Sequence, residues 1–160
     1  MKTFWPDSNV FMQAKNLYYA FDIAPGFWKG VAERAKAGSI QSPMMVYNEI
    51  AKGGDELAAW AKTVTLFVDP TKKVQETFSK IAEYVVHNGA FHPAQAALFL
   101  KGADAWVISS AIADGGVVVT REKLVGADST KVKIPNVCKH FGVDCVSCYE
   151  MIRRLGIVLK

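Results

Sequence analysis

The sequence predicts an α/β fold in which helices pack around a short parallel sheet. Short apolar segments alternate with longer amphipathic ones, which is typical of parallel strands joined by helices. The segment Val117–Thr120 is the clearest buried strand, because it is β-branched and lies between turn-forming residues. No repeat, linker or low-complexity tract divides the 160 residues, so we expect a single domain over residues 1–160.

The first half of the chain is expected to hold strands separated by helices. The expected strands are Lys2–Asp7, Ser39–Ser42 and Thr65–Val68. Pro6 cannot donate a ladder hydrogen bond, so it should lie at the end of its strand. The expected helices are Asn9–Lys15 followed by a turn at Asn16–Tyr19, then Phe27–Ala37, Met44–Ala51, Glu56–Lys62 capped by Asp55, and Thr71–His87.

The second half continues the same alternation. The expected helices are Ala94–Leu100, Ala105–Ala113, Ile134–Phe141 and a last one near Tyr149–Leu155. Besides Val117–Thr120, a short strand is expected at Asp144–Val146. Its sequence position between two helices predicts that it joins the same parallel sheet.

Composition and charge limit the classes of protein. Hydrophobic residues make up 51% and charged residues 21%, which predicts a buried core rather than disorder. No apolar run reaches the roughly 18–20 residues of a membrane span, and Asp7 interrupts any secretory signal, so we expect a cytoplasmic protein with no membrane partner. The net charge is +4, and residues 121–160 hold 8 Lys and Arg against 4 Asp and Glu. This basic quarter is either a contact for a phosphate backbone or a solvated face.

The three cysteines have a superficial metal-ligand spacing. Cys138, Cys145 and Cys148 form, with His140, the pattern C-x-H-x4-C-x2-C. A single CxxC pair among apolar residues is a weak zinc signal, and an odd number argues against a disulfide framework. We therefore expect buried thiols that bind no zinc.

Four acids lie where predicted strands end or helices begin. Asp7 closes the first strand, Glu49 lies on the helix after the second, Asp104 begins a helix, and Glu122 follows the strand Val117–Thr120. Ligands of open α/β sheets bind outside the carboxyl ends of the strands, so these acids can meet there. Clustered carboxylates repel each other, and Mg²⁺ or Mn²⁺ relieves this repulsion. Such ions suit the hydrolysis of a phosphodiester.

Each of the four acids also lies in a short motif. The segments are Asp7 to Phe11 (D-[TS]-N), Val46 to Ile50 (V-x-x-E-[IL]), Asp104 to Ala111 (D-x-x-[IL]-x-x-A) and Val118 to Glu122 (V-T-x-[DE]). In this order they resemble the acid motifs of PIN domains, the nuclease fold of many bacterial toxins of the VapC kind. Two further segments, Asn16 to Trp28 and Ile134 to Cys138, are similar to features of a narrower PIN-like family with a YYxFDxxPGFW hallmark.

The resemblance implies a three-layer α/β/α sandwich and an endoribonuclease that requires Mg²⁺ or Mn²⁺. Asp7, Glu49, Asp104 and Glu122 would be catalytic, and Asp7, Asp104 and Glu122 would bind the metal. The substrate would be RNA, and the partner a cognate antitoxin protein. The resemblance leaves the oligomeric state open and allows a homodimer, because dimers are common in this fold. Glu122 stands where many PIN domains carry Asp, and Asp128 is a competing fourth acid.

Several neighbouring side chains have two interpretations. Ser8 and Asn9 either hydrogen-bond Asp7 or a water, or cap the first helix. Thr120 lies two residues before Glu122 in the fourth acid motif and is expected to support the site. Arg121 and Lys123 either contact phosphates or lie in a solvated loop.

The aromatic stretch Tyr18–Trp28 also has more than one interpretation. Its rings either stack unpaired bases, pack in the core, or form the surface that an antitoxin covers. In the last case, Pro25-Gly26 would expose the start of the helix Phe27–Ala37 as a docking edge.

Two other classes of function compete with a nuclease. A catalytically inactive PIN-like module that binds RNA or protein would not need carboxylates at all four positions. A phosphotransferase or phosphatase with an aspartyl-phosphate usually has D-x-D after the first strand, whereas this chain has Asp7-Ser8-Asn9.

Overall fold

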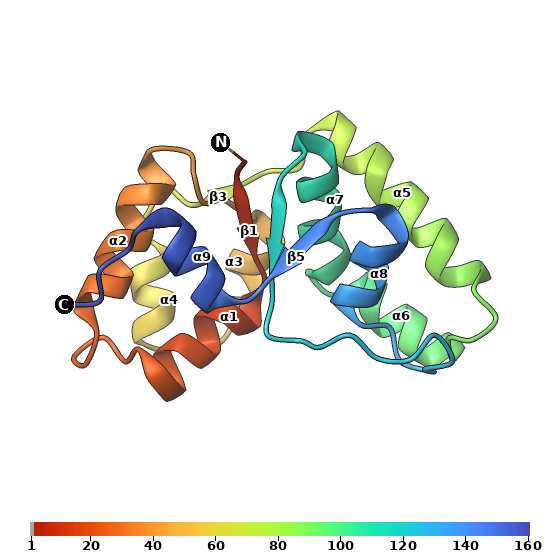
Figure 1. The fold of residues 1–160 in the computed structure, drawn as a ribbon, viewed down its shortest axis with the longest axis horizontal. Helices are drawn as coiled ribbons and strands as arrows, with labels where there is room; N and C mark the ends of the chain where they lie inside the picture. Colours follow the sequence, from red (N-terminus) through yellow and green to blue (C-terminus); the bar gives the residue numbers. More distant parts are fainter. Residues whose placement is uncertain (1) are drawn as a thin grey trace.

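A three-stranded parallel sheet lies at the centre of the fold, with helices on both sides of it (Figure 1). The computed structural model describes residues 2–160. The strand order is β1 (Phe4–Pro6), β4 (Val117–Val119) and β5 (Asp144–Val146), and β4 pairs in parallel with both neighbours. The predicted α/β class and its short parallel sheet between layers of helices are confirmed. Pro6 ends β1, as its missing N–H predicts.

A second, smaller parallel pair extends from this sheet. Residues 39–41 exchange hydrogen bonds of 2.9 and 3.0 Å with the backbone of Phe4. The next two residues form β2 (Ser42–Pro43), which pairs in parallel with a different strand, β3 (Phe67–Val68). The expected strand Ser39–Ser42 is therefore wrong in its bounds, since its two ends bond to different partners.

The helices form the two outer layers. In Figure 1, α2, α4 and α9 lie on one side of the sheet and α5, α6 and α8 on the other. In chain order they are α1 (Ser8–Gln13), η1 (Ala14–Tyr18), α2 (Pro25–Lys36), α3 (Met44–Ala51), α4 (Glu56–Ala61), α5 (Lys72–His87), α6 (Pro93–Lys101), α7 (Asp104–Asp114), α8 (Ile134–Phe141) and α9 (Cys148–Leu155). Within residues 2–160 no single helix has the length and apolar character of a membrane span, and α6 and α7 reach them only as a pair, across a bend of 65°.

The turn expected at Asn16–Tyr19 is instead a π-helical continuation of α1. In η1 the backbone N–H of Tyr19 donates to the carbonyl oxygen of Ala14 at 2.7 Å, five residues earlier. This wider hydrogen-bonded turn follows α1 without a break. The expectation of a turn was wrong because the polar residues there do not stop the helix.

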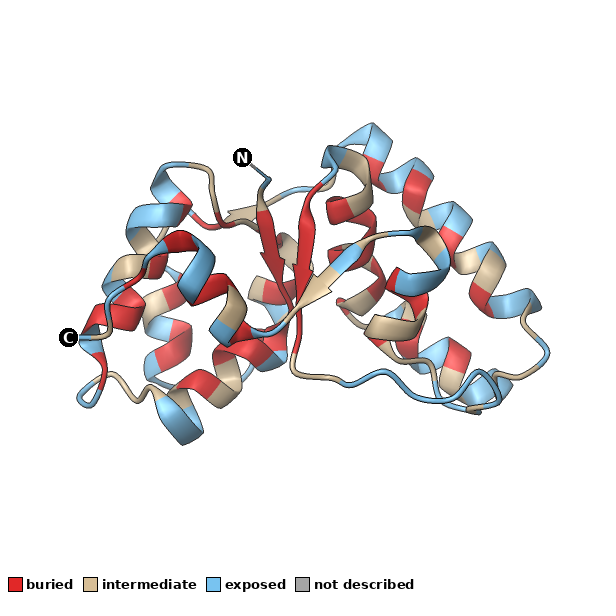
Figure 2. Cartoon of the chain, in the orientation of Figure 1, coloured by how far each residue is buried: buried red, intermediate tan, exposed pale blue. Residues whose placement is uncertain are grey.

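The core centres on β4, which is buried along its whole length (Figure 2). A side-chain carbon at Gly116, just before β4, would lie 2.5 Å from the carbonyl oxygen of Thr3, so only glycine allows this approach. The indole N–H of Trp5 donates to the Asp114 carboxylate at 3.0 Å. The end of α7 is thereby fixed to β1.

The aromatic stretch after η1 belongs mainly to the core. Phe27 is 0% and Trp28 3% exposed, and the Trp28 indole donates to the carbonyl oxygen of Tyr19 at 2.6 Å. Phe21 stacks on Trp28 with ring centroids 4.2 Å apart. Tyr18 differs, because it is 48% exposed. The idea that the whole stretch forms a contact surface is therefore wrong, and the core interpretation holds for its buried rings.

The start of α2 is covered by the C-terminal segment. A side chain at Gly26 would overlap the carbonyl oxygens of Val158 and Lys160, so the two segments touch backbone to backbone. Gly26 is itself buried. The expectation that Pro25-Gly26 exposes the start of the helix Phe27–Ala37 as a docking edge is therefore wrong.

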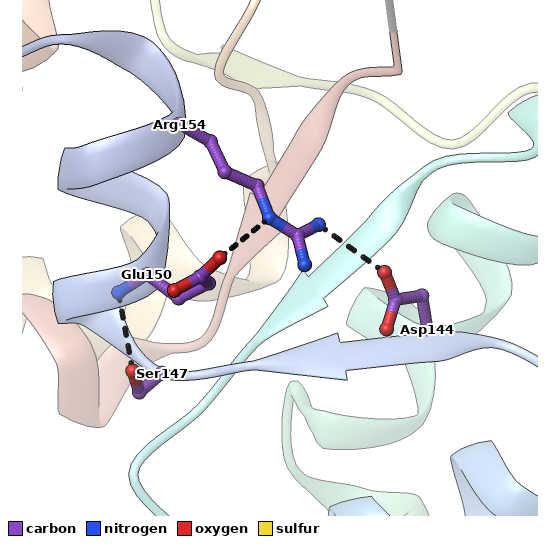
Figure 3. Close-up of polar contacts among 4 residues, drawn as sticks. All are labelled: Asp144, Ser147, Glu150 and Arg154. Carbon is purple, nitrogen blue, oxygen red and sulfur yellow. Dashed lines mark hydrogen bonds and ion pairs between the residues drawn. The ribbon is translucent and has the colours of Figure 1, made fainter.

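Polar contacts fix α9 against β5 (Figure 3). The Ser147 hydroxyl accepts a hydrogen bond of 3.2 Å from the Glu150 N–H and so caps α9. Arg154 donates to Glu150 at 3.0 Å and to Asp144, on β5, at 3.3 Å. These contacts are exposed and add little stability, but they orient the start of α9.

We predict that Trp28→Ala lowers the free energy of unfolding by about 3–5 kcal/mol, because it removes a buried ring from the core. Tyr18→Ala, at a half-exposed ring, should change it by only about 0.5 kcal/mol. Urea unfolding followed by circular dichroism measures both values. Similar losses for the two variants would contradict the burial that separates them.

Candidate active site

Asp7 is fixed at the end of β1 by three elements. It is 1% exposed and is the N-cap of α1. Its Oδ1 accepts a hydrogen bond of 3.0 Å from the N–H of Val10, and its Oδ2 one of 2.7 Å from the Thr120 hydroxyl, just after β4. Its own N–H donates to the carbonyl oxygen of Val119 at 3.0 Å. The carboxylate therefore has one defined orientation at the carboxyl ends of β1 and β4.

Glu49 connects three helices. From α3, its Oε2 accepts a hydrogen bond of 2.6 Å from the Ser8 hydroxyl, on α1. Its Oε1 accepts one of 2.7 Å from the N–H of Ala103, at the start of α7. Glu49 thus fixes the start of the helix whose first residue is Asp104.

Asp104 is the acid with the fewest ties to the protein. Among residues 2–160, no side chain or backbone N–H donates a hydrogen bond to its carboxylate within 3.5 Å. Its surroundings are charged instead, because Asp7, Glu49 and Glu122 act on it as negative groups and Lys133 as a positive one. Its oxygens are thus available to a ligand.

Glu122 joins the loop after β4 to α8. Its N–H donates to the Thr120 hydroxyl oxygen at 3.1 Å, and its Oε2 accepts a hydrogen bond of 2.8 Å from the N–H of Ile134. Asp128, the competing fourth acid, lies exposed in the loop and is not among the charges that perturb Asp7 or Asp104. The geometry favours Glu122 for this position.

Three of the acids accept hydrogen bonds from free N–H groups at helix starts. The donor lies at the start of α1 for Asp7, of α7 for Glu49 and of α8 for Glu122. The first N–H groups of a helix have no partner within the helix and carry partial positive charge. They therefore offset part of the repulsion among the acids.

The remaining repulsion and burial raise two pKa values. Desolvation is the main cause for Asp7, whose pKa rises to about 6 although Thr120 and Val10 hold its charged form. Desolvation, followed by the charges of Asp7, Glu122 and Glu49, raises the pKa of Asp104 to about 7. Because the acids influence each other in this way, they form one electrostatic cluster.

The cluster has ligands suited to a hard cation but is not closed around one. Carboxylate oxygens are the preferred ligands of Mg²⁺ and Mn²⁺. Within residues 2–160, however, no three His, Cys, Asp or Glu side chains stand close enough to hold one ion. The carboxylate oxygens suit such an ion, and binding it requires the acidic side chains to approach one another.

The predicted supporting residues have different positions. Ser8 bonds Glu49 rather than Asp7, and Asn9 is exposed. The Arg121 guanidinium lies 5.1 Å from the centroid of the Tyr18 ring, while Lys123 is exposed on the same loop. Arg121 is therefore packed rather than free in solvent.

The cysteines do not assemble with His140. Cys138 and Cys148 are buried, and Cys145 is half-buried. Burial raises the pKa of the Cys148 thiol to about 11, which disfavours a reactive thiolate. His140 stacks instead on Tyr84, with ring centroids 3.7 Å apart. The thiols are partly or fully buried side chains, and Cys138 and Cys145 hydrogen-bond each other. That they bind no zinc stays a prediction.

Lys133 was missed by the sequence reasoning. It precedes α8 and acts as a positive charge on Asp104. A signal was present, because Pro135 near the start of a helix marks an N-terminus, where acids gather. The basic residue before such a start is then a candidate partner for those acids.

The short parallel sheet with helices on both faces is a PIN-like α/β/α fold, and the four acids lie near its carboxyl edge. The chain belongs to the family described as Domain of unknown function (DUF4411), whose match spans residues 4–159. The fold is similar to the crystal structure of VapBC2 from Rickettsia felis bound to a DNA fragment from their promoter, with a TM-score of 0.56 and 13% identity. The similarity covers 91% of this chain and 98% of that chain. No curated protein matches the chain at a significant level.

We predict that Asp104→Asn stabilises the metal-free protein at pH 8. The folded pKa of about 7 lies above the ordinary value of 3.8, so the acid favours folding while protonated, and this contribution is lost as pH rises from about 4 to about 7. One pKa unit corresponds to about 1.4 kcal/mol, so the rise from 3.8 to about 7 sets an upper bound of about 4 kcal/mol. Solvent screening of the partly exposed carboxylate lowers the expected gain to the order of 1–3 kcal/mol.

The measurement is urea unfolding in EDTA from pH 4 to pH 8. The variant and the original protein should be similar at pH 4 and diverge as pH rises. Asp128→Asn, in the exposed loop, is the matched control and should follow the original protein throughout. Lower stability of Asp104→Asn at pH 8 would contradict the repulsion described here.

Proposed function

We propose that the protein is a metal-dependent endoribonuclease that hydrolyses RNA phosphodiesters and acts as the toxin of a toxin–antitoxin pair. The observation that carries this proposal is the convergence of Asp7, Glu49, Asp104 and Glu122 on one edge of the sheet. Such a cluster raises the pKa of Asp7 and Asp104. A purely structural role gives no reason to keep mutually repelling acids together.

In this proposal Asp7, Asp104 and Glu122 would hold Mg²⁺ or Mn²⁺. When bound, such an ion supplies positive charge that lowers the pKa of a water and stabilises charge developing on the phosphate. Asp104 offers both of its oxygens, and Glu122 offers Oε1, because Ile134 engages Oε2. The longer side chain of Glu122 can also orient the attacking water.

Other residues would position these acids. The Thr120 hydroxyl and the N–H of Val10 fix the Asp7 carboxylate. Glu49, held by Ser8, fixes the start of α7 and so the backbone of Asp104. Glu49 would therefore act mainly by orientation, and its loss would misplace a metal-binding acid.

Positive side chains would hold the substrate. Arg121, Lys123 and Lys133 lie on the segments next to Glu122 and Asp104. Lys and Arg contacts to phosphates position a nucleic acid without reading its sequence. Basic side chains beside the acids would hold the negatively charged RNA backbone next to the cluster.

A catalytically inactive PIN-like module is the second candidate. It is favoured by one observation, namely that no three of the acids, among the described residues, enclose a single ion in this conformation. Such a module would bind RNA or a protein without cutting. Metal-dependent cleavage of RNA separates the two candidates, because only the nuclease requires a divalent cation.

The proposed partner is an antitoxin protein. The likeness to VapBC2, solved bound to a DNA fragment from their promoter, supports a partnered toxin. An unrestrained ribonuclease would destroy the messages or tRNAs of its own cell, so an inhibitor is needed. A homodimer is part of the same proposal.

We predict cleavage of RNA only when Mn²⁺ or Mg²⁺ is present, with 5′-phosphate and 3′-hydroxyl product ends. Pure protein is incubated with total RNA and either ion or EDTA, and the product ends are sequenced. Three variants should each reduce the rate of RNA cleavage by at least about 100-fold: Asp7→Asn, Glu49→Gln and Asp104→Asn. Each removes a negative charge or weakens a hydrogen bond that positions the cluster.

Asp128→Asn is the control for this experiment and should cleave at the original rate. Circular dichroism must show that each inactive variant is folded. Full activity in EDTA, or 2′,3′-cyclic phosphate ends, would exclude the proposed mechanism.

We predict that a protein encoded beside this one binds it tightly and suppresses the cleavage. Tight binding follows from the need to silence a ribonuclease in the cell that makes it. Titration of that protein into the cleavage assay should reach full inhibition near a one-to-one ratio. Undiminished cleavage with every neighbouring gene product would contradict the toxin assignment but not the nuclease one.

A further inference from the structure

A cavity of about 520 Å³ lies beside the acid cluster. Thr120 and Glu122 form part of its wall, so it adjoins the carboxyl end of β4. Its other walls come from η1, the end of β5 and the start of α9. The volume lies within the range of about 300–1,000 Å³ that is typical of ligand sites.

Aromatic rings from two distant segments form one side of the cavity. Tyr18, on η1, and Tyr149, on α9, meet edge to face with ring centroids 6.3 Å apart. They are 48% and 49% exposed, unlike the buried rings of the core. Ring faces that are half open to solvent are available for stacking by a planar ligand.

Positive charge lies on the same cavity. The Arg121 guanidinium is 5.1 Å from the centroid of the Tyr18 ring, and Lys123 is a further lining residue. Among the described residues that line the cavity, Glu122 is the one acid, and its Oε2 is bound to the N–H of Ile134. The lining therefore combines stacking faces with cations, which suits a planar group attached to an anion.

The two tyrosines are held by defined local structure. The hydrogen bond of 2.7 Å from Tyr19 to Ala14 closes η1 and so places Tyr18. Ser147 caps the start of α9, and Arg154 bonds Glu150 on α9 and Asp144 on β5 (Figure 3). Tyr149 is the second residue of this capped helix. A binding site whose walls are already oriented loses less entropy when its ligand binds.

We propose that this cavity binds one unpaired nucleotide of the RNA, adjacent to the bond at the acid cluster. The base stacks on the open face of one of the two rings, Tyr18 or Tyr149, and contacts the other ring at its edge, while the attached phosphate pairs with Arg121 and Lys123. The inference rests on the proposed nuclease function of the acids and specifies its substrate class as single-stranded RNA. A base inside a duplex cannot enter, because its faces are covered by its stacked neighbours.

The first experiment uses the original full-length protein, in EDTA, so that no cleavage occurs. Fluorescence anisotropy measures binding of a labelled single-stranded RNA, of the same RNA in a duplex, and of copies with one abasic position each. Removal of the base at one position should weaken binding about tenfold, and the duplex should bind more weakly than the single strand. Equal affinity for all copies would overturn the proposal.

The second experiment uses protein variants with the intact RNA. Tyr18→Ala and Tyr149→Ala should each weaken binding about tenfold, whereas Tyr149→Phe keeps the stacking face and should bind normally. Leu98→Ala, at a residue that is 63% exposed on α6, is the matched control. Circular dichroism checks the fold, and the abasic series tests the cavity without any substitution.

The outcomes separate this proposal from the nuclease proposal. If the tyrosine variants bind and cleave RNA like the original protein, the cavity is not a nucleotide site, while the metal-dependent cleavage stands. If they lose only the binding of an inhibitor protein, the cavity is a protein contact and the proposal is overturned. If the original protein neither binds nor cleaves RNA, the nuclease function itself fails and this inference with it.

Discussion

The amino ends of three helices hold the acid cluster together. Asp7, Glu49 and Glu122 each accept a hydrogen bond from the start of a different helix, so the charge of the site is met by the partial positive charge of helix termini. Asp7 is at once the N-cap of α1 and a central acid of the site. The hydrogen bonds that join these helices therefore also position the acids.

The parts of the fold that follow from local patterns were predictable from the sequence. The bounds of α3, α8 and β5 match the expectation. Proline or glycine lies near both ends of α3 and α8, and the Ser147 cap of α9 follows β5. The meeting of Asp7 with Glu122 was also predictable in outline, since both follow strands that a parallel sheet places side by side. The preference for Glu122 over Asp128 needed the structure, because both lie in the same loop region.

Contacts between distant segments were not predictable. Ser8 bonds Glu49, 41 residues away, although its place after Asp7 suggested a role beside that acid. The aromatic stretch has no clear period, so the sequence did not separate the buried Trp28 from the exposed Tyr18. The covering of Gly26 by the C-terminal segment joins the two ends of the sequence, and no local pattern contains that information.

The π-helical turn of η1 also matters for how the sequence of this region can change. A residue in an α-helix is rotated by about 100° from its neighbour, so one inserted or deleted residue would normally turn every later side chain to another face. A π-turn takes up one extra residue within a helix that otherwise continues. Loss of one residue from Ala14–Tyr18 would therefore restore a regular helical turn and leave Tyr18 close to its present face. This segment can therefore change by one residue in length while its tyrosine stays on the same side of the helix.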